Sequence, residues 1–167
     1  MKTTKLFTLF LLITIALSSC SNGRLTEPEQ IGKNVFEILK TISTSGKQDY
    51  IDNFLSIEEI RELGKNEEVV KGESTRNEMT SMLKEKWIDR ITRDYNQIKE
   101  KGASSGIVWQ DIKYLDFVYE IKDKDGLKGA EGELYFKYNE ETYKVEISSI
   151  WNGKEYRIIE IEDLYKK

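Results

Sequence analysis

The sequence predicts an α+β domain in which about three N-terminal helices pack on a curved four-stranded antiparallel sheet. Two observations lead to this fold class. Apolar residues recur every three or four positions up to Gly102, the period of an amphipathic helix, and alternate with polar residues after Gly106, the period of a half-buried strand. Helices followed by a meander of strands bury both apolar surfaces when they pack in layers. One domain over residues 26–167 is therefore expected.

The first helix is predicted to begin near Pro28 and to end between Ser43 and Gly46. Thr26 and Glu29 have the spacing of a capping box, and a proline in the first turn leaves no helical hydrogen bond unmade. One face of this helix is apolar at helical spacing and is expected to join the core. The residues of that face are Ile31, Val35, Ile38, Leu39 and Ile42.

Two further helices are predicted before the change of period. The second covers residues 50–63 and contains a capping box at Ser56–Glu59. The third is a long helix over residues 75–102, with a capping box at Thr75–Glu78. Its apolar stripe consists of Met79, Leu83, Trp87, Ile91, Tyr95 and Ile98.

The last third of the chain is predicted to form four strands joined by tight turns. Asp125–Gly126, Asn139–Glu140 and Asn152–Gly153 mark the three turns, and the last is the strongest short hairpin signal. The alternation changes phase between Tyr114 and Leu115. Such a slip indicates a β-bulge, which bends the sheet.

The N-terminus has the features of an export signal. Lys2 and Lys5 precede an almost wholly apolar stretch at residues 6–17, which is shorter than the roughly 20 residues that a membrane span needs. The Leu-Ser-Ser-Cys sequence at residues 17–20 resembles the lipobox of bacterial lipoproteins. An ordinary cleaved signal peptide is the alternative interpretation of the same stretch.

The lipoprotein resemblance implies a signal peptide at 1–19, a diacylglycerol on the Cys20 thiol and acylation (palmitate, for example) of the new amine. Residues 20–25 then form a tether, and the chain reaches the membrane through the lipid on Cys20. The implied location is the bacterial cell envelope. Ser21 rather than aspartate follows the cysteine, which favours the outer membrane if the source is Gram-negative.

Composition narrows the chemistry that the chain can perform. The sequence contains no histidine and one cysteine, so a lipidated Cys20 leaves neither a thiolate nucleophile nor the usual zinc ligands. The 26 basic and 30 acidic residues are interspersed and give a net charge of −4. A chain without a basic stripe is not expected to bind nucleic acid.

The strands near the C-terminus resemble those of the nuclear transport factor 2-like superfamily, in which helices fill the concave side of a curved sheet. The matching residues are Tyr143, Val145 and Ile147, the Asn152–Gly153 turn, and Tyr156 to Ile159. A cystatin-like domain and a lipoprotein-specific α+β fold have the same pattern. The superfamily resemblance implies a pocket between helix and sheet, for which the candidate lining residues are Trp87, Tyr95, Phe117, Tyr119 and Phe136.

Carboxylates at Glu58–Glu62 and at Glu160–Asp163 have the spacing of solvated helix and strand positions rather than of acid–base pairs. No catalytic, cofactor-binding or metal-binding residue is predicted.

The expected function is therefore binding of a peptide or small molecule by an envelope-anchored domain. One alternative is an immunity or inhibitor lipoprotein that binds a toxin or envelope hydrolase through an acidic surface. A second is a carboxylate-dependent enzyme with a cone-shaped pocket.

Overall fold

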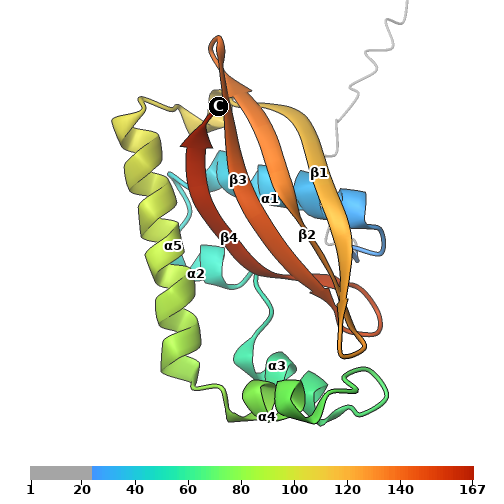
Figure 1. Ribbon diagram of the computed structural model, residues 1–167. Helices are drawn as coiled ribbons and strands as arrows, with labels where there is room; N and C mark the ends of the chain where they lie inside the picture. Colours follow the sequence, from blue (N-terminus) through green and yellow to red (C-terminus); the bar gives the residue numbers. More distant parts are fainter. Residues whose placement is uncertain (1–23) are drawn as a thin grey trace, which may run out of the picture.

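A computed structural model describes residues 24–167 and confirms the α+β class (Figure 1). The predicted leader and Cys20 lie outside the described residues. Four antiparallel strands form one twisted sheet in the order β1-β2-β3-β4, so each strand pairs with its neighbours in the chain. The strands are β1 (Lys113–Lys124), β2 (Leu127–Tyr138), β3 (Glu141–Trp151) and β4 (Tyr156–Lys166).

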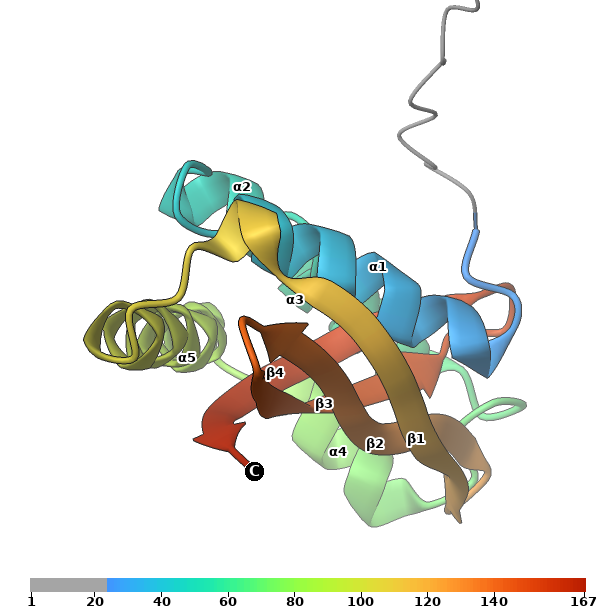
Figure 2. The same ribbon diagram turned by 90° about the horizontal axis from the view of Figure 1, so that it is seen from above.

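Helices cover one face and one edge of this sheet (Figures 1 and 2). Helix α1 (Pro28–Thr41) crosses one face, where Gly32 packs directly on the Phe117 side chain. Helix α5 (Lys84–Ser104) runs beside β4 at the edge of the sheet. A short 3-10 helix, η1 (Trp109–Asp111), joins α5 to β1. Among the described residues, no helix packs across the middle of the other face, as Figure 1 shows.

The prediction of about three helices is corrected to five α-helices within residues 24–167. The second predicted helix is two helices, α2 (Lys47–Ile51) and α3 (Ile57–Lys65). The third is also two, α4 (Glu73–Ser81) and α5, because Met82 and Leu83 adopt extended backbone angles. Only Met79 is buried in α4, which packs mainly on α3. The chain must therefore turn at Met82 for the stripe of α5 to reach β4.

Two of the three predicted capping boxes are wrong. The N-cap of α1 is Glu27 rather than Thr26, and the side chain of Gln30 accepts hydrogen bonds from the N–H groups of both residues at 3.0 and 2.8 Å. Helix α4 begins at Glu73, and the Thr75 hydroxyl instead donates to Asp125 in the β1–β2 turn. The Ser56–Glu59 box at the start of α3 is confirmed, with both reciprocal bonds formed.

The predicted turns lie where the sequence places them. Asp125 and Gly126 have positive φ angles of 55° and 81°, as a two-residue hairpin requires, and Asn139 has a φ of 53°. The third turn is longer than predicted and spans residues 152–155. Within it, the side-chain oxygen of Asn152 accepts hydrogen bonds from the N–H groups of Lys154 and Glu155. The predicted bulge is confirmed by a register shift at Tyr114/Asp116.

One hydrophobic core fills the space between α1, α5 and the covered face of the sheet. Phe136 at its centre is fully buried, and its ring lies 6.0 Å from Trp109 and 5.7 Å from Tyr143. None of the helices in residues 24–167 has both the length and the apolar character required to span a membrane.

Candidate functional site

The strand register divides the sheet into an apolar face and an acidic face. Phe117, Leu134 and Val145 are paired across β1, β2 and β3, and their side chains enter the core. The next residue along each strand points to the opposite side, because side chains alternate along a strand. On that side the register forms one row of Val118, Glu133, Glu146 and Glu162. The neighbouring row is Glu120, Glu131, Ser148 and Glu160.

These two rows place six glutamates together, and we call this surface the acidic face. It consists of Glu120, Glu131, Glu133, Glu146, Glu160 and Glu162. An open depression of about 590 Å³ lies over its centre, and every charged residue that lines it is a glutamate. The surface is therefore a broad patch of negative potential, because like charges on neighbouring strands add their fields.

Basic side chains neutralise part of this charge. Lys144 forms an ion pair with Glu133 and lies 3.6 Å from Glu146, while Lys122 pairs with Glu120. The hydrogen bond from Lys144, followed by that from the Tyr135 hydroxyl, lowers the pKa of Glu133 below its ordinary value. By contrast, Glu131 and Glu162 have no ion pair among the described residues.

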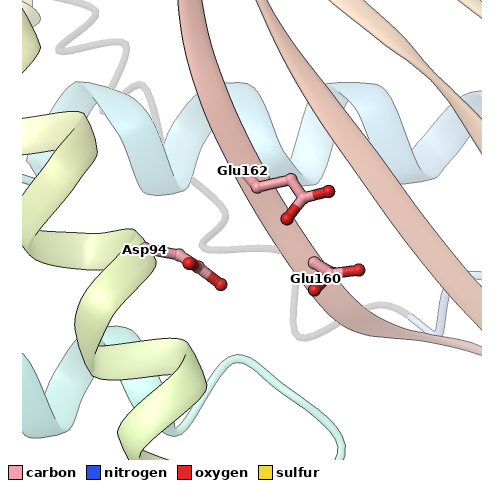
Figure 3. A group of neighbouring side chains, drawn as sticks. All are labelled: Asp94, Glu160 and Glu162. Atoms are coloured by element: carbon pink, nitrogen blue, oxygen red, sulfur yellow. The ribbon is translucent and has the colours of Figure 1, made fainter.

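The most crowded part of the acidic face is where β4 meets α5 (Figure 3). Asp94 points from α5 toward Glu160 and Glu162 on β4, and carboxylate oxygens of the three residues lie within 4.8 Å of one another. Asp94 is buried and accepts from Arg93 at 3.0 Å, and Arg90 lies 3.5 Å from Glu160.

Crowding at this position changes the titration of Glu162. Burial, followed by the negative charges of Glu160 and Asp94, raises the pKa of Glu162 above its ordinary value. Three carboxylates at this spacing are also the kind of oxygen donors that Ca²⁺ or Mg²⁺ takes. The arrangement therefore attracts cationic groups, whether an ion or the side chains of a basic protein.

The structure distributes the five aromatic residues predicted to line a pocket between the core and two surface depressions. Trp87, Tyr95, Phe117 and Phe136 are buried in the core. Tyr119 is half-buried and stacks on Phe117 at 5.3 Å, and its hydroxyl donates to Glu29 of α1. Trp87 borders one surface depression and Tyr119 another, while the other three border neither.

The depression beside Trp87 lies between α2, α3 and α5 and has a volume of about 400 Å³. Its walls are tied together by hydrogen bonds. The Trp87 indole N–H donates to the Leu55 carbonyl at 3.1 Å, and Arg157 donates to the Phe54 carbonyl at 3.1 Å. Arg157 also lies 3.6 Å from Glu59. These polar groups of the depression are thus engaged within the chain, unlike Glu131 and Glu162 of the acidic face, which have no ion pair among the described residues.

The acidic face was not predicted from the sequence, although a signal for it exists. Glu131 and Glu133, like Glu160 and Glu162, are two positions apart and so share a side of their strand. Their contribution to one surface becomes visible only with the register of all four strands. The chain matches no protein-family model, no curated protein and no solved structure.

Proposed function

We propose that this chain is a lipid-anchored protein of the cell envelope that binds a basic protein partner through its acidic face. This is the immunity or inhibitor type of function expected as an alternative from the sequence. The observation that carries the proposal is the two adjacent rows of glutamates on a sheet face whose middle no helix of the described residues covers. A basic surface docked there would neutralise charges that now repel one another.

The form of the depression favours a protein surface over a small ligand or an enzymatic substrate. Small-molecule sites are concave, mostly apolar and enclosed, with a few polar groups. The depression on the acidic face is open, and five of its ten lining residues are glutamates. The space between helix and sheet, where a cone-shaped pocket was expected, contains the buried aromatic core.

Electrostatic attraction also fits an inhibitor that must capture its target quickly. Complementary charge raises association rates, and its effect weakens as salt is added. Anchoring through the lipid on Cys20 would hold the acidic face at the membrane surface, where an incoming basic protein would meet it.

The binding proposal is tested by neutralising the acidic face without changing its shape. We expect Glu131→Gln/Glu146→Gln/Glu162→Gln to lose photocrosslinking to a basic envelope protein in the native host. The matched control is Glu37→Gln/Glu62→Gln/Glu67→Gln, which removes the same charge from exposed positions on α1, α3 and the loop after α3. Equal crosslinking by both variants, or a captured protein that is acidic, would contradict the proposal.

The anchor is tested separately on the native protein. Mass spectrometry of the N-terminal peptide is expected to show a chain that begins at Cys20 and carries acyl groups. Cys20→Ala should leave the protein out of the membrane fraction, whereas Ser21→Ala should keep it there because the lipobox is intact. An unmodified thiol, or a leader that is still attached, would contradict the lipoprotein assignment.

A further inference from the structure

The two edges of the sheet differ in what covers them. At β4, the Leu55 N–H donates to the Ile158 carbonyl at 2.8 Å, and Phe54 forms a parallel bridge with Ile158. Helix α5 lies beside the same strand, as Figure 1 shows. At the other edge, β1 pairs with β2 alone within the described residues. A strand edge of this kind is a template for a further strand.

Strand β1 also has more exposed large apolar side chains than any other strand of the sheet. Leu115, Val118 and Ile121 are 47 %, 56 % and 49 % exposed. They make up half of the large apolar side chains that are exposed in residues 24–167. An edge strand that exposes apolar side chains gains from being covered, because the covering strand removes them from water.

The hairpin geometry shows which backbone groups of β1 are free. The two-residue turn at Asp125–Gly126 is closed by a hydrogen-bonded pair, Lys124 and Leu127, and bonded and non-bonded pairs alternate from there. The register is unbroken back to Asp116, so Tyr119 and Ile121 direct their N–H and C=O groups away from β2. Phe117 also directs its backbone N–H away from β2, and this N–H donates to the Asp116 side chain at 2.8 Å.

The side chains along β1 define what a fifth strand would contain. On the acidic face, the edge strand itself carries Asp116, Val118, Glu120 and Lys122, of which Lys122 pairs with Glu120, and Glu131 and Glu133 lie one strand behind. On the opposite face of the same strand stands Ile121. A complementary strand would therefore place basic residues on the acidic face and apolar residues on the other, in alternation.

We propose that the free edge of β1 accepts an extended segment of the partner in which basic and apolar residues alternate. The inference rests on the proposed function, because the basic residues of this segment are what the acidic face attracts. Backbone pairing at Tyr119 and Ile121 holds the segment in register. The charges of Asp116 and Glu120 select for lysine or arginine on one side.

The probe for this pairing is a synthetic peptide of about ten residues in which lysine and valine alternate. Binding to the full chain is expected to slow amide hydrogen exchange at Tyr119 and Ile121, two of the outward N–H groups of β1. A peptide of the same composition with its lysines in one block should not protect them. Unchanged exchange at both amides with the alternating peptide would overturn the proposal, even if the peptide binds.

A pair of variants at one position separates backbone pairing from side-chain contact. Ile121→Pro removes an outward N–H, and we expect it to lower the affinity for the alternating peptide about tenfold or more. Ile121→Thr keeps the N–H and is expected to bind within about threefold of the wild type. Equal affinities would overturn strand addition, and circular dichroism of both variants verifies that the sheet is intact.

The outcomes also separate this inference from the proposed function. If Ile121→Pro binds normally but Glu131→Gln/Glu146→Gln/Glu162→Gln does not, the acidic face is retained and strand addition is rejected. If neither variant loses affinity, both ideas are rejected. A second copy of this chain on β1 is a different occupant, and dimerisation by analytical ultracentrifugation that Ile121→Pro abolishes would overturn the inference.

Discussion

The two faces of the β-sheet come from the same four strands but have opposite properties. On the covered face, Leu134, Phe136 and Val145 are completely buried in the hydrophobic core. On the acidic face, their neighbours Glu133 and Glu146 form a charged row on the same strands. Alternation along a strand therefore lets one segment supply both a core and a recognition surface, and each can be changed without the other.

The largest loss of stability is expected from a cavity on the covered face. Phe136→Ala removes a fully buried ring between Trp109 and Tyr143 and should lower the free energy of unfolding by about 3–5 kcal/mol. Tyr135→Ala, at the next position but on the acidic face, should cost less than half as much. Urea unfolding followed by circular dichroism measures both, and similar losses would show that the two faces are not independent.

A smaller effect is expected where α1 meets the sheet. A Cβ atom at Gly32 would overlap the Phe117 side chain, so Gly32→Ala forces α1 away from β1. We expect a loss of about 1–3 kcal/mol, the usual cost of overpacking. Lys33→Ala changes the next residue, which is exposed, and should stay within about 0.5 kcal/mol of the wild type. A Gly32→Ala variant as stable as the wild type would contradict the close packing of α1.

The covered face was the more predictable of the two. The apolar periods, the turns at Asp125 and Asn139, and the bulge beside Leu115 all follow from residues close in sequence. The break at Met82 was missed because its cause is distant: α4 packs on α3 while α5 must reach β4. The cluster that Asp94 completes was missed for the same reason. It depends on how α5 packs against β4, and no local pattern specifies that packing.

The mildest prediction concerns Glu162, where the acidic face is most crowded. Its pKa is raised in the folded state by burial and by the charges of Glu160 and Asp94, so the folded protein holds this proton more tightly than the unfolded chain. The resulting stabilisation is complete below the unfolded pKa and is lost as the pH rises through the folded pKa. Above the folded pKa, the charge of Glu162 therefore opposes folding.

Glu162→Gln removes that charge while keeping the shape of the side chain. We expect it to raise the free energy of unfolding at pH 7 by a few tenths to about 1 kcal/mol, with a smaller gain at pH 4, because protonation of the wild-type carboxyl relieves the same repulsion as the pH falls. Urea titrations at the two pH values measure the difference, and Glu37→Gln on α1 serves as the exposed control. A loss of stability at pH 7 would mean that Glu162 is held by a favourable contact. In that case the crowded carboxylates would not destabilise the folded protein, and a basic partner would have no such destabilisation to relieve.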